Sequence, residues 1–383
     1  MDIASMLVRE DFYTILQETL RAYYRQVHNR DVRVEYTPFE GCETLYIYSR
    51  LSFIARKKVP CGAREFLYGE FNIRGNLIKY LAGKLLVFLA VHSGGRGATR
   101  KLYITRGALG QNAFISPQNR SIRIFDYDAM TVDCIVKSSF TSTYFNNQLA
   151  FRTQYHYPFV PPILATSEGW FREHIMRGNP LARVTNNEAY KAAQSRVIQY
   201  IGELASDTVQ LTSSAEYMGG LIKDVYAKLG RAESEKKIAS APALKTLVRS
   251  IEERVSDMPI PLVRSHGDLQ SGNIWLETDG RVWIYDWETQ KTRSIWYDCV
   301  TLLYSTRRAG GLERFMSSPD ISLAFANDDR TERTPQSVRL IKDIVLLEDM
   351  LFYLEDMLEL PALDGAEIFE RFAARVLNLP KGV

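Results

Sequence analysis

The sequence has few cysteines and no long apolar run. Its four cysteines (Cys42, Cys61, Cys134, Cys299) among 383 residues are far apart and form no C-x-x-C pair. This spacing excludes a dense disulfide framework and argues against a structural zinc site. The most apolar run, Leu85–Val91, is about a third of the ~20 residues that a membrane-spanning helix needs. Because no basic and apolar leader opens the sequence, we expect a cytoplasmic protein without a transmembrane segment.

A strong excess of one charge is also absent. The chain has 48 Lys and Arg against 45 Asp and Glu, a formal net charge of +3. This charge is too small to suggest a protein that neutralises many phosphates, so we expect no nucleic-acid partner. A hydrophobic content of 46% and a charged content of 24% are ordinary for folded chains and exclude disordered and collagen-like classes. At roughly 100–200 residues per domain, the length allows two or three compact units.

The first hundred residues predict a unit of their own. Apolar residues recur at helical spacing over 10–29, strand-like runs follow over 32–37 and 44–59, and a second helical pattern covers 64–91. We interpret residues 1–100 as an accessory domain whose role the sequence leaves open. The segment 73–91 carries basic residues beside its apolar run, so peripheral membrane contact is the alternative to a helix that faces the core.

The rest of the chain predicts a small sheet followed by a helical half. Residues 101–140 contain three or four runs typical of antiparallel strands, and a helical stretch follows over 142–157. A connector near 173–180 leads to a part in which helical periodicity dominates. The helical segments expected there are 187–205, 213–230, 241–256, 338–358 and 365–377.

The residues with the clearest chemical pattern lie between 266 and 286. His266-Gly267-Asp268 is followed by Asn273 five residues after Asp268, and by Asp286 eighteen residues after it. Two strand-like runs flank a Thr-Asp-Gly turn, which predicts a hairpin with Asn273 at its entrance and Asp286 at its exit. Magnesium prefers such oxygen ligands and is usually held by one or two of them together with substrate phosphates. Asp268 would then be free to orient a hydroxyl and accept its proton.

The motif HGDLQSGNIWL followed by IYDWE resembles the signature of the aminoglycoside phosphotransferase and choline kinase family. The resemblance implies an α+β, two-lobed protein-kinase-like fold, with a small antiparallel sheet lobe over 101–177 and a larger helical lobe over 178–383, behind the extra N-terminal domain. It implies that Asp268 is the catalytic base and that His266 buttresses the loop. Asn273 and Asp286 match the Mg²⁺ ligands, and ATP is the implied co-substrate.

The resemblance also places the nucleotide. Lys137, at the end of a predicted strand, matches the lysine that contacts the α- and β-phosphates. Gln148 stands where the family has a glutamate that pairs with this lysine. The backbone of Glu173, His174 and Ile175, in a hinge over 173–177, matches the segment that receives the adenine edge.

The phosphate-binding turn departs from the family pattern. The turn 117–120, Pro-Gln-Asn-Arg, has no glycine, although glycine often allows the backbone to approach a phosphate closely. Phosphate contacts would then come from the side chains of Asn119, Ser121 or Arg120. The turn 106–110, Arg-Gly-Ala-Leu-Gly, is an alternative that contains glycine, and the sequence does not decide between the two.

The resemblance implies a small-molecule alcohol as the acceptor, for which we expect a sugar hydroxyl first. Choline-like amino alcohols and aminoglycosides are the alternatives, and Trp287 and Glu288 are the residues expected nearest the acceptor. The acids of the C-terminal helical segment, Glu348 and Asp349 among them, are expected on a solvated helix face. A further alternative is a catalytically weak nucleotide-binding scaffold that acts through a protein partner. The missing glycines and Gln148 motivate that reading, and the oligomeric state stays open.

Overall fold

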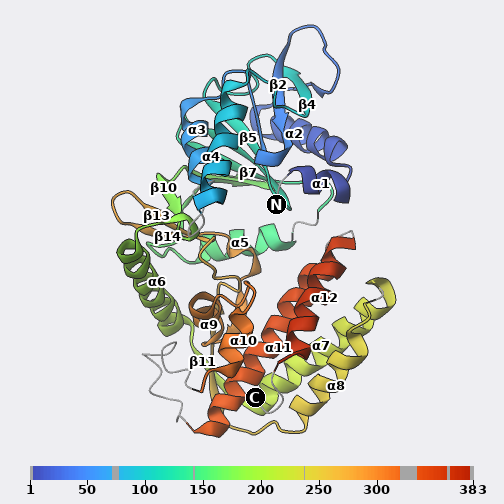
Figure 1. Cartoon of the computed structure of the whole chain (residues 1–383), viewed down its shortest axis with the longest axis vertical. Coiled ribbons are helices and arrows are strands. Elements are labelled where there is room, and N and C mark those ends of the chain that lie inside the picture. The colour runs from blue at the N-terminus through green and yellow to red at the C-terminus, as the bar shows by residue number, and fades with distance from the viewer. Residues whose placement is uncertain are drawn as a thin grey trace. The chain divides into compact units, whose positions relative to one another are not determined.

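The computed structural model describes residues 3–70, 77–140, 143–236, 238–319, 334–359 and 363–379. The chain divides into two compact units (Figure 1). The first, which we call the sheet unit, comprises Met1–Gln194 and Gly272–Glu288. The second, the helical unit, comprises Ser195–Ser271 and Thr289–Val383. An antiparallel sheet and a helix-rich unit are the two parts that the α+β prediction requires.

One nine-stranded sheet dominates the sheet unit, in the order β1-β4-β2-β3-β5-β6-β7-β9-β8. All of its pairings are antiparallel. The strands are β1 (Val34–Glu35), β2 (Cys42–Tyr48), β3 (Phe53–Ala55), β4 (Arg100–Thr105), β5 (Ala113–Pro117), β6 (Ser121–Asp126), β7 (Thr131–Val136), β8 (Ile163–Ser167) and β9 (Trp170–His174).

The boundary expected at residue 100 falls inside this sheet. β4 pairs with β1 and β2, and β3 pairs with β5 through Ile54 and Ile115. Leu45 and Ile54 are buried in one core cluster with Leu102, Ile115 and Ile135 from beyond the boundary. Residues 1–100 are therefore not a separate accessory domain, because their strands extend the same sheet and share its core.

Helices cover both faces of the sheet. Neighbouring strand residues alternate between two cores, so Ile115 and Ile124 belong to one cluster whereas Phe114 and Phe125 belong to the other. The first cluster includes α1 (Ile3–Arg9) and α2 (Phe12–His28), and the second includes α3 (Cys61–Glu70), α4 (Leu77–His92) and α5 (Thr143–Gln154). In Figure 1, α1 and α2 lie apart from α3 and α4 accordingly. These helices confirm the helical patterns read from the sequence.

A small second sheet contains the predicted hairpin. β10 (Gly178–Pro180) pairs with β13 (Ile274–Glu277), which pairs with β14 (Val282–Ile284). Gly280 has a φ of 87°, a left-handed value that glycine adopts without a steric penalty and that the tight turn between β13 and β14 uses. The hairpin is confirmed, and it belongs to the sheet unit.

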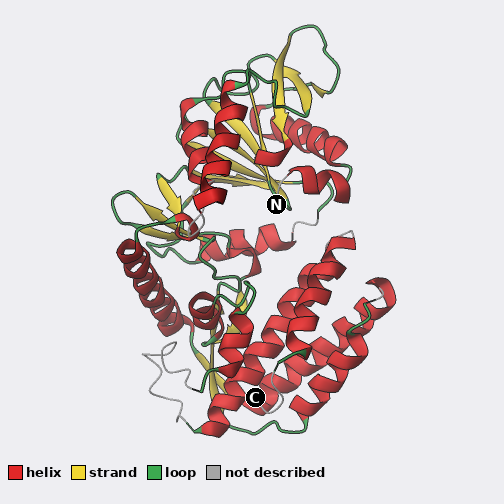
Figure 2. Ribbon diagram, in the orientation of Figure 1, coloured by secondary structure: helices red, strands yellow, loops and turns green. Residues whose placement is uncertain are grey.

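The helical unit is built around long helices (Figure 2). Its helices are α6 (Asn187–Thr208, whose first residues belong to the sheet unit), α7 (Ser214–Lys236), α8 (Ala241–Glu252), α9 (Tyr297–Tyr304), α10 (Gly311–Ser317), α11 (Pro335–Glu359) and α12 (Leu363–Leu377). A three-stranded sheet joins β11 (Gln210–Ser213), β12 (Pro259–Ser265) and β15 (Lys291–Ser294). Within the described residues, no helix is long and apolar enough to cross a membrane.

Two acids of α11, Glu348 and Asp349, do not lie on the solvated face expected from the sequence. Glu348 and Asp349 are 2% and 1% exposed. Glu348 accepts hydrogen bonds from the Tyr217 hydroxyl and from Ser294, and Asp349 is paired with Arg307. These partners come from distant parts of the chain, so spacing along α11 alone could not reveal them.

Candidate functional site

The loop that carries Asp268 is fixed by hydrogen bonds within the helical unit. It follows the end of β12, and His266 is completely buried. The backbone N–H groups of His266 and Gly267 donate to the two carboxylate oxygens of Asp298, at 2.6 and 2.9 Å. The hydroxyl of Thr289 donates to the His266 carbonyl at 3.1 Å. The loop is therefore held at its backbone, and the Asp268 side chain has separate partners.

Gly267 is required by both conformation and space. Its φ is 87°, in the left-handed region that side chains rarely adopt. A Cβ at this position would lie 2.4 Å from Arg293 Nη1 and 2.4 Å from the Thr289 carbonyl oxygen. One residue away, His266 Nδ1 accepts a hydrogen bond from the Asp268 N–H at 3.2 Å. This contact fits the buttressing role expected for His266.

Two side chains hold the Asp268 carboxylate. Arg307 Nε donates to Oδ1 at 3.0 Å, and Gln270 Nε2 donates to Oδ2 at 2.9 Å. Arg307 also donates to Asp349 at 2.5 Å, so its charge is shared between two carboxylates. Asp268 keeps 18% of its side chain exposed, against 8% for Arg307. The sequence did not point to Arg307, which lies beyond the motif and follows no spacing rule.

The mouth of the hairpin brings Asn273 and Asp286 together in the sheet unit. The Tyr285 N–H donates to the Asn273 carbonyl at 2.8 Å, directly before Asp286. Asp286 itself has a φ of 67°, which is uncommon for a residue other than glycine. Such backbone strain is concentrated at functional sites, where the surroundings enforce it.

The donor set at this mouth fits Mg²⁺ held jointly with phosphates. It offers one carboxylate and one amide oxygen, and an ion bound in this way needs only one or two protein ligands. Among the residues that the structure describes, no three His, Cys, Asp or Glu side chains form a cluster that could hold a metal ion. A metal cage made wholly by such side chains is thus not what this region provides.

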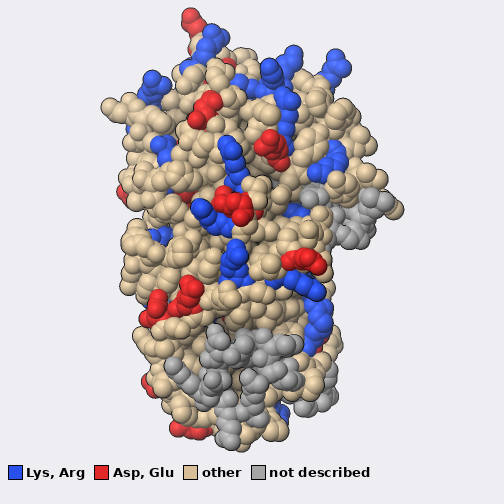
Figure 3. All heavy atoms as spheres, turned by 90° about the vertical axis from the view of Figure 1, so that its left-hand side faces the viewer, with Lys and Arg blue, Asp and Glu red and all other residues tan. Residues whose placement is uncertain are grey.

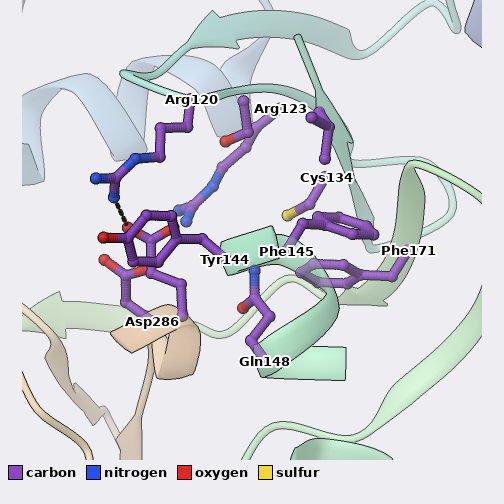
Figure 4. Close-up of a pocket in the computed structure, with 11 residues that line it drawn as sticks. Arg120, Arg123, Cys134, Tyr144, Phe145, Gln148, Phe171 and Asp286 are labelled. Atoms are coloured by element: carbon purple, nitrogen blue, oxygen red, sulfur yellow. Dashed lines mark hydrogen bonds and ion pairs between the residues drawn. The ribbon is translucent and has the colours of Figure 1, made fainter. Parts of the chain in front are cut away.

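A pocket in the sheet unit contains Asp286 (Figure 4). In the close-up, Arg120, Tyr144 and Asp286 gather on one side of the pocket, and Cys134, Phe145 and Phe171 on the other. The lining residues are Arg120, Ser121, Arg123, Cys134, Val136, Tyr144, Phe145, Gln148, Phe171, Asp286 and Glu288. The pocket thus combines an apolar wall with a wall that carries both cations and carboxylates.

The turn between β5 and β6 lies at this pocket. Arg120 and Ser121 line it, and Asn119 Oδ1 is buried without a hydrogen-bond partner among the described residues. The glycine-containing turn 106–110 is at the other end of β5. Of the two alternatives for the phosphate-binding turn, the structure therefore brings 117–120 to the pocket.

Arg120 and Glu288 form an ion pair in the pocket lining. Arg120 Nη1 lies 2.5 Å from Glu288 Oε1, and the guanidinium lies 4.0 Å from the centre of the Tyr144 ring. Glu288 was expected near the acceptor, and the structure places it beside the turn 117–120.

Lys137 is not at the pocket, contrary to its expected role. Its Nζ lies 2.5 Å from Glu10 Oε1, and the lysine side chain is 1% exposed. The reason is the alternation of side chains along β7 and its continuation. Cys134 and Val136 face the pocket, so residue 137 points to the opposite face, where Glu10 follows α1.

Arg123 reaches the pocket in its place, from the neighbouring strand β6. Its Nε is buried and has no hydrogen-bond partner among the described residues. Burial lowers the pKa of this guanidinium, but the surrounding Cys134, Glu173 and Asp286 raise it by more, so the net pKa lies above the usual value. The sequence held a signal for Arg123, because period-two alternation puts it on the same face of β6 as Ser121.

Gln148 lines the pocket, but its expected partner Lys137 is on the other face. A different residue of α5, Arg152, makes the ion pair with β9: its Nη2 lies 2.5 Å from Glu173 Oε2. Both side chains of this pair are 3% exposed. The Glu173 side chain is therefore buried in an ion pair with Arg152.

The expected adenine-binding backbone is already engaged in part. The N–H of Ile175 donates to the Met130 carbonyl at 3.0 Å, so it is not free for a base edge. Glu173 pairs with Val132 of β7 and His174 pairs with Thr131. This corrects the hinge assignment for Ile175, whose N–H continues the pairing of β9 with the β6–β7 turn.

Trp287 is a core residue. It is 1% exposed, and its ring stacks on that of Phe151 at a centroid distance of 4.2 Å. Its indole N–H donates to the Ile284 carbonyl at 2.7 Å. A side chain buried in this way cannot touch an acceptor, so the contact expected from the sequence is wrong.

No family model and no curated protein matches the chain. Among solved structures, similarity is found to an ethanolamine kinase from Plasmodium vivax, with 13% identity, a TM-score of 0.47, and coverage of 83% of this chain and 94% of that one. A choline kinase from Streptococcus pneumoniae matches with 12% identity, a TM-score of 0.40 and coverage of 69% and 89%. An aminoglycoside phosphotransferase in complex with AMP-PNP and hygromycin B matches with 13% identity, a TM-score of 0.48 and coverage of 71% and 95%. These are proteins of the kind that the motif resembles.

Proposed function

We propose that this chain is an ATP-dependent phosphotransferase that moves the γ-phosphate to a hydroxyl group of a small molecule. The observation that carries the proposal is the strained Asp286 beside Asn273, in a pocket that also contains Arg120 and Arg123. Oxygen ligands next to cations are what a magnesium–triphosphate complex needs.

The polar residues in and next to the pocket divide the work in this proposal. Asn273 and Asp286 would hold Mg²⁺, which supplies charge neutralisation to the phosphates. The unpartnered Nε of Arg123 is available for a phosphate oxygen, and the buried Asn119 Oδ1 lies in the adjoining turn. Arg120 can bind a phosphate once its ion pair with Glu288 opens.

Asp268 is the proposed base. Its carboxylate would orient the acceptor hydroxyl and take its proton as the oxygen attacks the γ-phosphorus. Arg307 and Gln270 fix the orientation of this carboxylate, and the Asp298 contacts fix the loop. Most of the rate enhancement would then come from positioning.

The test is transfer of labelled γ-phosphate from ATP, in the presence of Mg²⁺, to a panel of sugars, amino alcohols and aminoglycosides. We expect a product with at least one class, sugars being the first candidates. Asp268→Asn should lower the transfer rate about 10²- to 10⁴-fold, which is the usual contribution of a positioned base, and leave nucleotide binding intact. Asp279→Asn, in the exposed hairpin turn, is the matched control and should retain full activity.

Two results would contradict the proposal. Transfer that survives Asp268→Asn would remove the assigned base. Nucleotide binding without transfer to any acceptor would favour the nucleotide-binding scaffold, for which the displaced Lys137 is the supporting observation.

A further inference from the structure

The outer side of α4 is an apolar surface that the described protein leaves uncovered. Five large side chains on this helix are at least half exposed, and we call them the α4 outer face: Ile78 (80%), Leu81 (56%), Leu85 (58%), Phe88 (50%) and Leu89 (55%). Only four other large apolar side chains among the described residues are exposed, and none of them is on α4. The exposed apolar surface is therefore concentrated on this helix.

The α4 outer face forms one stripe. Its members recur at intervals of three and four residues, which places them on the same side of a helix. The opposite side, which includes Val87, Ala90 and Val91, is buried in the core that α3, α4 and α5 share. The sequence expectation of a core-facing helix is thus correct for one side only.

Cations border the stripe, and acids are missing. A groove beside α4 contains Phe88 and Leu89 together with Arg50, His92 and Arg96, and no Asp or Glu lines it. Lys57 lies next to the turn after α4: its Cε is 3.4 Å from the position that a Cβ atom would occupy at Gly94. On the face drawn in Figure 3, Lys and Arg side chains stand over the sheet unit with Asp and Glu side chains between some of them, so the shortage of acids is local to the groove beside α4.

The sequence around α4 also has basic residues and lacks acidic ones. Residues 71–125 contain no Asp or Glu. The Lys and Arg residues of this stretch are Arg74, Lys79, Lys84, Arg96, Arg100, Lys101, Arg106, Arg120 and Arg123. A partner of the α4 outer face would therefore have to be both apolar and negatively charged.

We propose that the α4 outer face binds the surface of an anionic lipid bilayer. The apolar side chains would enter the boundary between headgroups and acyl chains, and Arg50, Arg96 and Lys57 would meet lipid phosphates. An exposed apolar helix face bordered by cations is what such interfacial binding requires. A second copy of the chain fits less well, because a symmetric contact would bring the same acid-free surfaces together. The proposal does not depend on the phosphotransferase function.

The experiment is sedimentation of the full chain with vesicles. Neutral phosphatidylcholine vesicles are compared with vesicles that contain phosphatidylglycerol as well. We expect binding to the anionic vesicles that weakens with salt. The triple variant Leu81→Ser, Leu85→Ser, Phe88→Ser should bind at least about tenfold more weakly, because apolar burial drives this mode of binding. Arg50→Gln and Arg96→Gln should each weaken binding about fivefold, as expected for one cation near a charged surface.

Control variants distinguish the loss of the α4 outer face from unfolding of the protein. Leu164→Ser and Leu211→Ser change exposed leucines elsewhere and should leave vesicle binding unchanged. The thermal unfolding midpoint of the triple variant should match that of the unchanged chain, since the replaced side chains are exposed. The proposal is overturned if the unchanged chain does not sediment with anionic vesicles. It is equally overturned if light scattering shows a dimer that the triple variant dissociates, because a second copy would then cover the face.

Discussion

Arg123 and Lys137 show how the position of one cation decides whether it can meet a phosphate. Lys137 is neutralised by Glu10 in a buried ion pair, and separating such a pair leaves an uncompensated charge in the core. Arg123 has a buried Nε without a partner, which is costly unless a ligand supplies an acceptor. The guanidinium is thus prepared for an anion, whereas the ammonium is already engaged.

We therefore expect Arg123→Met to weaken nucleotide binding about tenfold to a hundredfold. Hydrogen bonds to charged groups contribute about 1.5–3 kcal/mol, and each 1.4 kcal/mol corresponds to a tenfold change in affinity. The measurement is the dissociation constant of a fluorescent ATP analogue in the presence of Mg²⁺.

The matched control is the double variant Glu10→Gln, Lys137→Met. Removing both charges avoids a buried unpaired carboxylate, so this variant should fold and bind nucleotide like the unchanged chain. If the double variant loses binding while Arg123→Met keeps it, Lys137 has the role that the sequence suggested. If the unchanged chain binds no nucleotide at all, the proposed function itself fails.

At the scale of elements, α11 is tied to β15 and α7 through one acid. Glu348 accepts hydrogen bonds from the Tyr217 hydroxyl at 2.6 Å, from the Ser294 N–H at 2.6 Å and from the Ser294 hydroxyl at 2.7 Å. Burial raises the pKa of Glu348 to about 7, although these hydrogen bonds act in the opposite direction. The acid is therefore expected to be largely protonated in the folded chain below neutral pH.

This raised pKa predicts a stability that falls with rising pH. The folded chain keeps the Glu348 proton up to about pH 7, whereas an unfolded carboxyl loses it near its ordinary value of about 4.3. Between these values the folded state binds more protons, so the free energy of unfolding decreases as pH rises through this window. One pKa unit corresponds to about 1.4 kcal/mol, so the contribution lost is of the order of 2–3 kcal/mol.

Urea unfolding at pH 5 and pH 7.5 tests this expectation. Glu348→Gln keeps a neutral side chain of similar shape and should remove about 2–3 kcal/mol of the difference between the two pH values. Glu252→Gln, another glutamate that accepts from a tyrosine hydroxyl but at an exposed contact, is the control and should leave the difference unchanged. An unaltered pH dependence in the Glu348 variant would show that Glu348 is ionised in the folded chain.

For the whole molecule, local sequence patterns predicted the helices and the hairpin well, but they did not predict which distant strands pair. The hairpin around Gly280 and the long helices follow from turn chemistry and periodicity, and the spacing of Asn273 and Asp286 was enough to place both at its mouth. The pairing of Ile54 with Ile115 joins segments that are far apart in sequence. No local pattern specifies such a contact, which is why a domain boundary was expected near residue 100.

The predicted place of Lys137 at the pocket was wrong for a related reason. Its place at a strand end was visible in the sequence, but the face it occupies depends on the register of β7 against its neighbours. Arg307 and Glu173 could not be assigned either, since each is defined by a partner far away in the chain. Side-chain roles that depend on tertiary register thus need coordinates.

The continuous sheet makes a final prediction about residues 1–100. A protease site inserted into the 106–110 turn would cut the chain between β4 and β5 without removing any strand; Gly107 in that turn has open space around it. We expect the two fragments to stay together during gel filtration, because β3 still pairs with β5 and the Lys137–Glu10 ion pair still joins them. A fragment that begins at residue 101 and is expressed alone should fail to fold, since it lacks the three strands β1, β2 and β3 and leaves the Lys137 charge without Glu10. The prediction is contradicted if the fragments separate in native buffer, or if a fragment from 101 onward shows a cooperative thermal transition. Residues 1–100 would then be a separate domain.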